Sequence, residues 1–520
     1  MTVKSIKIQS CNYTKEDNKM QLQKKYLIIV PHPDDEINIA GQLICQLTQT
    51  NNEVHVLFTT NGDYYIYEGE RRLKEAINAL RVLGVDEKNI IFMGYGDDWK
   101  GKKHIYNAKD ETAIESMGGR RQTYGLKTHP EYRFTKSGCH YEYTRKNYKQ
   151  DMMDVILDLL ADVLVVVDFD WHPDHRCTSL MFEEVMGDIL KAKNDYKPVV
   201  LKKFAYGGVW NGPKDYYKIP GKATCLPSKE LVNDARFETD VPAYTWADRI
   251  RFEPSAETQT LMIKKNIIYK SAKEHRTQSA RFRIDRICNA DIVYWLRKTN
   301  SLSYQAKIQA SSGDCTFLND FKLIDCPDVN TQQKGIGIFG DCVWTPDKTD
   351  PLKTVTFFFY NPVSVSCLSF YENFSLEDHI QNGIIQFDNG FRVETGPLNH
   401  CGSETVVEFS TQYNIKSLSF QITESIGDCA GLTELEIYEK RENPDLSYIA
   451  RTYSSDRNTD AEIDVGYYAA AFLEQCSLET ARFFMRLKRK MIRGLILKNK
   501  DTHVKSLPTA QLRRTENKNT

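Results

Sequence analysis

The stretch that decides the fold is a short apolar run that leads directly into imidazole and carboxylate groups: Tyr26-Leu27-Ile28-Ile29-Val30-Pro31-His32-Pro33-Asp34-Asp35-Glu36. Residues 163–175 repeat this design, because an apolar run is followed by Asp168-Phe169-Asp170-Trp171-His172-Pro173-Asp174-His175. Apolar strands separated by helices are typical of a parallel sheet covered on both faces. Ligands of such sheets lie beyond the carboxyl ends of the strands. We therefore expect both polar stretches at one edge of a sheet.

The same alternation of strands and helices continues through the first half of the chain. We predict further strands at 54–58 and 89–93, and helices at 36–47, 69–83 and 151–160. The pattern indicates an α/β domain with a Rossmann-like, mostly parallel sheet over residues 23–300.

The pattern changes at about residue 301, where short alternating strands with polar turns take over. Strands predicted at 355–359, 368–370 and 418–422 indicate a β-sandwich over residues 302–440. The remaining segments are predicted as an N-terminal extension, a linker, a basic amphipathic helical segment and a polar tail, at residues 1–22, 441–460, 461–500 and 501–520.

Composition narrows the class of protein. With 520 residues the chain is about three times as long as a typical domain. Its 41% hydrophobic and 27% charged residues exclude collagen, a wholly disordered chain and a membrane bundle. The 69 Lys and Arg against 70 Asp and Glu leave a formal net charge of −1, so we predict no nucleic-acid partner.

The chain start and the cysteines bear on the cellular compartment. Residues 1–25 are polar, and no stretch approaches ~18 uncharged apolar residues, so we predict neither a cleavable signal peptide nor a transmembrane span. The 13 cysteines are scattered without a CxxC pair, which favours reduced thiols and a cytoplasmic location. Six of them lie between residues 315 and 429 and would be able to form disulfides in an exported chain.

The imidazoles and carboxylates after the two strands form a ligand set that suits zinc. Three protein ligands and one water make an open, catalytic site. A nearby carboxylate would deprotonate the water, and a spare histidine would stabilise the developing oxyanion. Either segment alone has a simpler explanation, since Asp34 or Asp35 is able to cap the following helix and an isolated HxxH pair is commonly a surface feature. The two together favour the metal site.

The motifs at residues 31–36 and 172–175 resemble those of the PIG-L (LmbE-like) family, whose members are zinc-dependent de-N-acetylases of N-acetylglucosamine conjugates. The resemblance spans roughly residues 23–300. It implies that the protein releases acetate from an N-acetylated amino sugar. The residues that it implies as ligands of Zn²⁺ are His32, Asp35 and His175.

The resemblance also implies the catalytic groups. Asp34 would be the general base, His172 would polarise the amide oxygen and stabilise the tetrahedral intermediate, and Asp174 would orient His172. An acetamide is a poor electrophile, and zinc meets that difficulty by lowering the pKa of its water to ~7. The leaving amine takes a proton from His172 or from Asp34, and the sequence leaves both donors open. It also leaves open a non-catalytic carbohydrate-binding protein, and action on another acyl amide of an amino sugar.

Two further segments resemble substrate-binding parts of the family. Asp63 and Arg72 are implied to bind the substrate, although Arg72 would also suit a solvated helix face. The stretch with His275 and Gln278 resembles a His-x-Ser-Gln segment in which Thr277 replaces Ser, so the roles of both residues stay open. We interpret the long insert between Tyr95 and Tyr148 as a lid that shapes substrate choice.

The C-terminal half offers two further expectations. Residues 423–438 resemble the end of discoidin (factor 5/8 type C, galactose-binding-like) sandwiches, which implies glycan contact through loops at one end; the alternative is a structural domain packed on the catalytic one. Residues 481–500 carry eight basic residues and no acidic one, with apolar residues at helical spacing. Such a helix is able to lie on an anionic membrane surface, making the cytoplasmic protein peripheral, or to pack its apolar stripe on the protein.

Overall fold

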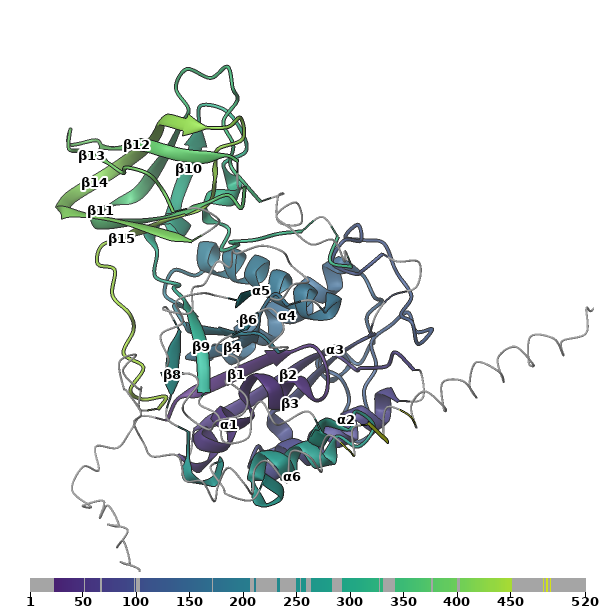
Figure 1. Ribbon diagram of the computed structural model, residues 1–520. Coiled ribbons are helices and arrows are strands. Elements are labelled where there is room, and N and C mark those ends of the chain that lie inside the picture. Colours follow the sequence, from purple (N-terminus) through teal and green to yellow (C-terminus); the bar gives the residue numbers. More distant parts are fainter. Residues whose placement is uncertain are drawn as a thin grey trace, which may run out of the picture. The chain divides into compact units, whose positions relative to one another are not determined.

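The computed structural model of the chain is shown in Figure 1. The predicted N-terminal extension and polar tail lie outside the described residues, as do half of the predicted linker and most of the predicted helical segment. The structure describes residues 23–50, 52–65, 68–97, 99, 103–170, 172–205, 210–211, 232–233, 249–252, 254–258, 263–282, 292–326, 328–330, 342–375, 377–399, 403–450, 480, 483–484 and 487.

The first sheet has its strands in the order β3-β2-β1-β4-β5-β9-β8. The β1–β2, β2–β3, β1–β4 and β4–β5 pairs are parallel, whereas β9 pairs antiparallel with β5 and β8. The predicted mostly parallel α/β sheet is therefore confirmed. The strands are β1 (Lys25–Val30), β2 (Glu53–Thr60), β3 (Ile90–Tyr95), β4 (Val163–Val167), β5 (Val199–Lys203), β8 (Ile250–Phe252) and β9 (Ile292–Arg297), with a separate short pair β6 (Trp210–Asn211) and β7 (Val232–Asn233).

Helices cover both faces of this sheet, with α4 and α5 on one face and α1, α2 and α6 on the other (Figure 1). Helix α4 begins earlier than the predicted 151–160, because the hydroxyl of Thr144 caps it by accepting the N–H of Asn147 at 3.1 Å. The helices are α1 (Asp35–Gln49), α2 (Gly69–Val82), α3 (Tyr132–Ser137), α4 (Arg145–Leu159), α5 (Pro173–Ala192) and α6 (Ile267–Glu274).

The order of the strands fixes where a ligand would bind. Strands β1 and β4 are neighbours, with Ile29 opposite Val166, although they lie far apart in the sequence. From β1 the sheet extends in one direction through β2 to β3, and from β4 it extends in the opposite direction to β5. This reversal makes the carboxyl ends of β1 and β4 the switch point, where ligands of open α/β sheets bind.

The second sheet is antiparallel, with the order β10-β11-β14-β12-β13 and β15 paired to β11. Two of its strands are much longer than predicted: the runs predicted at 355–359 and 368–370 are parts of one strand, β11. Register shifts between Phe358 and Cys367 let this strand continue through irregular positions. The strands are β10 (Ala306–Ala310), β11 (Thr354–Glu372), β12 (His379–Phe387), β13 (Arg392–Glu394), β14 (Glu404–Ile426) and β15 (Leu432–Tyr438).

The antiparallel part has its own apolar core, which includes the buried Trp344, Phe370 and Phe420. It also contacts the α/β part, because Arg297 at the end of β9 donates a hydrogen bond to Glu436 of β15 at 3.1 Å. The described cysteines of this region, Cys315, Cys326, Cys342, Cys367 and Cys429, are free thiols. Among the described helices, none has the length and apolar character needed to cross a bilayer.

Candidate active site

The turn after β1 holds His32 and Asp35 in a local arrangement. The backbone N–H of Asp35 donates to the carbonyl of His32 at 3.0 Å, and the N–H of His32 donates to Asp35 Oδ2 at 3.2 Å. The ring nitrogen His32 Nδ1 lies 2.9 Å from the same Asp35 oxygen. Both side chains are buried. The sequence spacing of three residues is thus enough to place one imidazole and one carboxylate together.

The turn after β4 brings His175 to the same carboxylate. Helix α5 begins at Pro173, which suits the first turn of a helix because its missing N–H needs no partner there. His175 Nε2 lies 3.1 Å from Asp35 Oδ2. The two sequence-predicted imidazole ligands, His32 and His175, therefore both approach the same carboxylate oxygen of the third ligand, Asp35. The two separations from that oxygen, 2.9 and 3.1 Å, approach the ~3.3 Å between neighbouring ligand atoms of a tetrahedral zinc with bonds of ~2.0–2.1 Å.

Both imidazoles carry a carboxylate on their opposite nitrogen. His32 Nε2 lies 3.3 Å from Asp174 Oδ2 and 3.3 Å from Asp97 Oδ1. His175 Nδ1 lies 2.7 Å from Asp170 Oδ2. A carboxylate on the far nitrogen fixes the tautomer and orientation of a metal-binding histidine. The donor set, its spacing and these supporting carboxylates all fit a metal ion.

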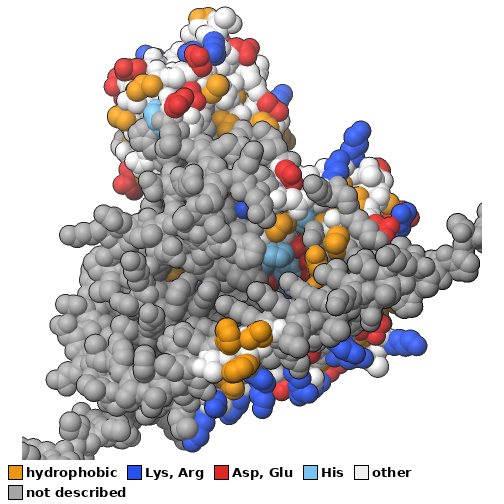
Figure 2. Space-filling view, turned by 45° about the vertical axis from the view of Figure 1, so that its right-hand side comes forward, with side chains coloured by type: hydrophobic (Ala, Val, Ile, Leu, Met, Phe, Trp, Pro, Cys, Tyr) orange, Lys and Arg blue, Asp and Glu red, His pale blue; other side chains and the backbone are white. Residues whose placement is uncertain are grey.

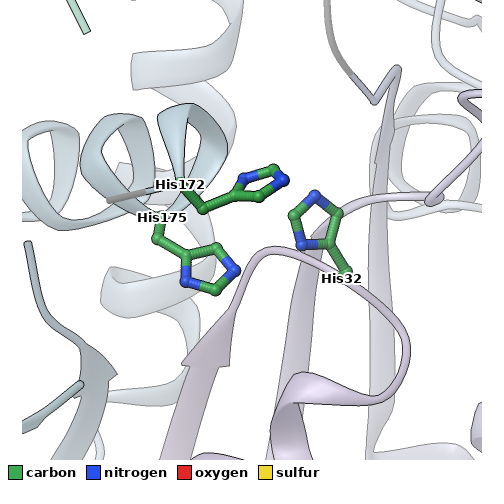
Figure 3. Close-up of side chains that lie close together, drawn as sticks. All are labelled: His32, His172 and His175. Carbon is green, nitrogen blue, oxygen red and sulfur yellow. The ribbon is translucent and has the colours of Figure 1, made fainter. Parts of the chain in front are cut away.

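His172 completes a group of three imidazoles. Figure 3 shows the rings of His32, His172 and His175 turned toward one another, with 4.8 Å between the ring centroids of His172 and each of the other two. Their nitrogen atoms are close enough to share an ion, as are ligand atoms of His32, Asp97 and Asp174. Figure 2 shows histidine and acidic side chains gathered together on one face of the molecule.

The orientation of His172 comes from the backbone of its predicted partner. The N–H of Asp174 donates to His172 Nδ1 at 3.3 Å, so the ring proton lies on Nε2. The Asp174 carboxylate is farther from this ring, at 3.7 Å, and approaches His104 and His32 more closely. Burial, followed by the nearby His32 and His175, lowers the pKa of His172 to about 4. A pKa of about 4 leaves the ring neutral at pH 7.

Charge in the site reflects the surplus of carboxylates. Burial by itself lowers the pKa of His175, but Asp170 and Asp35 raise it to about 10. Burial likewise raises the pKa of Asp35, yet His175 and His32 hold it well below its usual range. A cavity that stabilises positive charge on imidazoles in this way also attracts a metal cation.

Asp34 occupies a strained position beside this cluster. Its φ of 130° lies in the left-handed region that non-glycine residues rarely adopt, and its side chain is buried. The conformation is held from two sides: its N–H donates to Glu36 Oε2 at 2.8 Å, and Arg72 Nη2 donates to its Oδ1 at 3.2 Å. Glu36 in turn lies 2.5 Å from His275 Nε2, so the late His275 stretch supports this turn.

The two predicted substrate-binding residues, Arg72 and Asp63, are buried and form hydrogen bonds within the protein. Arg72 is buried rather than solvated, and it donates to the carbonyls of Gly62 at 3.0 Å and Pro33 at 2.9 Å. Gly62 has a φ of 63°, and a Cβ there would lie 2.4 Å from Arg72 Cζ, so only glycine fits. Asp63 accepts hydrogen bonds from the N–H of Asp97 at 2.8 Å and from Tyr124 at 3.0 Å.

Sequence reasoning missed three residues of the site: Asp97, His104 and Asp170. Asp97 and Asp170 follow the carboxyl ends of β3 and β4, so the rule for open sheets applied to every strand would have found both. His104 lies in the insert and donates from Nε2 to Asp174 Oδ1 at 3.0 Å. No local pattern marks it. The predicted Gln278 donates to Thr277 at 3.2 Å, and Thr277 binds Glu75 of α2.

Comparisons with known proteins agree with this geometry over part of the chain. Residues 27–186 match the PIG-L family model, described as GlcNAc-PI de-N-acetylase, and residues 303–438 match a domain family of unknown function. A probable N-acetylglucosaminyl-phosphatidylinositol de-N-acetylase of Dictyostelium discoideum is 31% identical over 77 residues, which is 15% of this chain and 30% of that protein's length. The discoidin resemblance of the second domain stays a prediction.

Similar solved structures include an N,N'-diacetylchitobiose deacetylase of Pyrococcus horikoshii, with 21% identity, a TM-score of 0.22 and coverage of 35% of this chain and 55% of the other. A family 32 carbohydrate-binding module of Clostridium perfringens NanJ has 16% identity, a TM-score of 0.19 and coverage of 26% and 94%. Scores this low carry no argument about activity. The family match stands without them, and residues 27–186 therefore form a domain of the PIG-L de-N-acetylase type.

Proposed function

We propose that the protein is a zinc-dependent hydrolase that removes the acetyl group from an N-acetylated amino sugar of the N-acetylglucosamine type. The observation that carries the proposal is the meeting of His32, Asp35 and His175 around one carboxylate oxygen, with Asp34 next to them. The match of residues 27–186 to de-N-acetylases supports the reaction class. The specific conjugate is left to experiment.

Zinc held by His32, Asp35 and His175 would lower the pKa of a bound water to ~7 and polarise the amide carbonyl. Asp34 is the general base that takes the proton of the attacking water. Its carboxylate is aimed by Arg72, whose Nη2 donates to Oδ1 at 3.2 Å, and by the strained turn at Asp34 itself. Arg72 is therefore proposed to position Asp34, and its hydrogen bonds to the protein argue against direct contact with the sugar.

His172 is proposed to stabilise the oxyanion as a neutral imidazole. Its Nδ1 accepts the N–H of Asp174, so Nε2 carries the proton and would donate to the amide oxygen as negative charge develops there. The pKa of His172, which burial lowers to about 4, supports the neutral form over a protonated imidazole. The leaving amine takes its proton from Asp34, which has just received one from water, because a neutral His172 has no acidic proton to give.

The test is acetate release over a panel of N-acetylhexosamine conjugates: free sugar, nucleotide sugar, lipid-linked sugar and polymer. We expect release from at least one conjugate, loss of activity after dialysis against a chelator, and recovery on addition of about one equivalent of zinc per chain. Activity that survives complete removal of metal would contradict the proposal. Sugar binding with no acetate release from any conjugate would favour the non-catalytic carbohydrate-binding alternative, which gives no reason for a strained carboxylate at Asp34.

We also propose a cytoplasmic protein that contacts anionic membranes through residues 481–500. Within that segment the described Phe483, Phe484 and Leu487 have 61%, 63% and 42% of their surface exposed, as a membrane-facing stripe requires. Deletion of residues 478–520 should abolish pelleting with anionic liposomes, whereas unchanged pelleting would contradict the assignment.

We also propose that loops of the second domain contact a glycan. Binding of the full chain to a glycan array tests this proposal.

A further inference from the structure

Residues 322–326 and 328–330, here called the strap, lie in the segment that matches the second family model, yet they contact the α/β part. Tyr106 of the insert donates its hydroxyl proton to Asp325 Oδ1 at 2.7 Å. Lys322 Nζ donates to the same Tyr106 oxygen at 3.0 Å and to Asp325 Oδ2 at 2.7 Å. The buried Cys326 and Val329 belong to the apolar core that includes Tyr106 and much of α5. The strap is therefore packed as an integral part of the α/β domain.

One arm of the strap leads to Asp174. The N–H of Val329 donates to Asn107 Oδ1 at 2.9 Å, so the strap holds both Tyr106 and Asn107. These residues lie two and three positions after His104 in the chain. The N–H of Tyr106 donates to His104 Nδ1 at 3.3 Å, which leaves the His104 proton on Nε2, where it faces Asp174 Oδ1 at 3.0 Å. His104 is 1% exposed, so this contact is made without competing water.

The other arm leads to Asp170. Arg176, the residue after His175, donates from Nη1 to the carbonyl of Val329 at 3.2 Å and from Nε to the carbonyl of Asp170 at 2.7 Å. The Asp170 carboxylate accepts from His175 Nδ1 at 2.7 Å. Arg176 is buried, with its guanidinium 5.0 Å from the centre of the Phe169 ring. The strap thus reaches both carboxylates that orient the candidate metal-binding imidazoles: Asp174 through Tyr106 and His104, and Asp170 through Arg176.

We propose that the strap is a positioning element of the metal site: it fixes His104 against Asp174 and Arg176 against Asp170, and so fixes the orientation of His32 and His175. The second domain would then contribute to the reaction from a distance, without touching the substrate. The catalytic part of this inference rests on the proposed deacetylase function, whereas its effect on metal affinity does not. Partners that orient metal-binding residues typically change metal affinity or activity by ~10–100-fold.

The test removes one hydroxyl that links the strap to the insert. In the full chain, Tyr106→Phe keeps the ring in the core and deletes the bridge to Asp325 and Lys322. Tyr132→Phe is the matched control, because Tyr132 donates a similar hydrogen bond to Asp158, at 2.6 Å on the surface. We expect Tyr106→Phe to weaken zinc binding about 5–10-fold in chelator competition and to lower kcat by a similar factor, with KM within about twofold and Tm close to that of the control.

A double-mutant cycle with His104→Ala separates positioning from general stabilisation. If Tyr106 acts through His104, the double variant should lose no more zinc affinity than His104→Ala alone, since residues in one network are not additive. His104→Gln, which keeps a donor at the place of Nε2, should recover part of the loss. Asp325→Asn, which keeps the shape of the strap, should repeat the effect of Tyr106→Phe if that variant folds poorly.

The outcomes distinguish the two proposals. Equal zinc affinity in Tyr106→Phe, Asp325→Asn and Tyr132→Phe would overturn the inference about the strap, whatever the activity. If zinc binding is weaker in the first two variants but the wild-type chain releases no acetate, the inference about the strap would be supported and the proposed deacetylase activity would be contradicted. Additive losses in the cycle with His104→Ala would show that Tyr106 does not act through His104, and would also overturn the inference.

Discussion

The two strand ends that build the candidate site are supported in different ways. After β1 the polar groups pair within a few residues: His32 contacts Asp35, and the N–H of Asp34 reaches Glu36. After β4 the pairing is partly remote, because Asp174 contacts residues 70 and 142 positions earlier in the chain, His104 and His32. On the β1 side, most polar groups of the turn are paired with one another. On the β4 side, the positions of the carboxylates depend on contacts with the insert and the strap.

This difference assigns separate tasks to the two sides. Asp34 on the β1 side is the proposed general base. The carboxylates on the β4 side, Asp170 and Asp174, orient imidazoles from behind. Changes at Asp34 should therefore act on kcat with the metal retained, whereas changes at Asp170 or Asp174 should act first on metal affinity.

The largest expected effect is that of Asp34→Asn on the β1 side. The variant removes the general base but none of the proposed zinc ligands, so kcat should fall by ~10³-fold while the zinc content stays near one per chain. Acetate release and metal analysis on the same preparation provide the measurement, with Asp188→Asn on the exposed side of α5 as control. Full acetate release by Asp34→Asn would show that another group accepts the proton.

The next effect tests a remote support of the β1 turn, the pair of Glu36 and His275. Both side chains are fully buried and lie 2.5 Å apart. His275→Ala would leave the Glu36 charge without its partner, and loss of one member of a buried pair costs about 3–5 kcal/mol of unfolding free energy. Urea unfolding of the full chain is the measurement. Glu36→Gln combined with His275→Ala should recover part of the loss, and a single variant as stable as wild type would contradict the role of this pair as a support of the turn.

Much of the β1 side could be predicted because its contacts are local. A three-residue spacing brings His32 and Asp35 together, and apolar runs before each motif predict buried strands with a shared carboxyl edge. The parallel sheet followed from the same runs. The long strands β11 and β14 did not, because irregular registers let a single strand continue past polar positions that look like turns.

On the β4 side, the sequence predicted the residues that directly follow the strand but not their distant partners. His172 and His175 stand out after an apolar strand, but nothing near His104 marks it as a partner of Asp174, since that contact depends on how a long insert folds back. The burial of Arg72 could likewise not be predicted from the sequence of α2, because an arginine on a helix is equally compatible with a solvent-exposed face. Its position depends on Gly62, whose missing Cβ leaves room for the side chain.

A smaller effect is expected from Asp170→Asn on the β4 side. The amide keeps the shape but holds His175 less strongly, so zinc affinity should fall by ~10–100-fold. At saturating zinc, kcat should recover most of its wild-type value, in contrast to Asp34→Asn. Chelator competition measures the affinity, and Asp162→Asn, whose partner Lys24 is at the surface, is the control. A kcat that stays low at saturating zinc would place Asp170 in the reaction itself and break the division between the two sides.

The smallest expected effect concerns the acid stability of the β4 side. Glu184 of α5 accepts hydrogen bonds from Arg145 and Lys149 of α4 and lies 3.8 Å from Lys322 of the strap. Burial alone would raise the pKa of Glu184, but Lys322, Arg145 and Lys149 lower it from 4.5 to about 2. A lowered pKa in the folded state contributes stability that is present above pH 4.5 and is lost as the pH falls toward 2.

Glu184→Gln should therefore lower the unfolding free energy at pH 7 by roughly 1–2 kcal/mol, after allowance for partial exposure of the side chain. The difference from wild type should shrink steadily below pH 4.5, as urea unfolding at pH 7, 4.5 and 3 would show. Asp188→Asn, which removes a more exposed partner of the same Lys149, should change stability little at any of these values. A loss for Glu184→Gln that persists undiminished at pH 3 would mean that packing, and not charge, joins α5 to the strap.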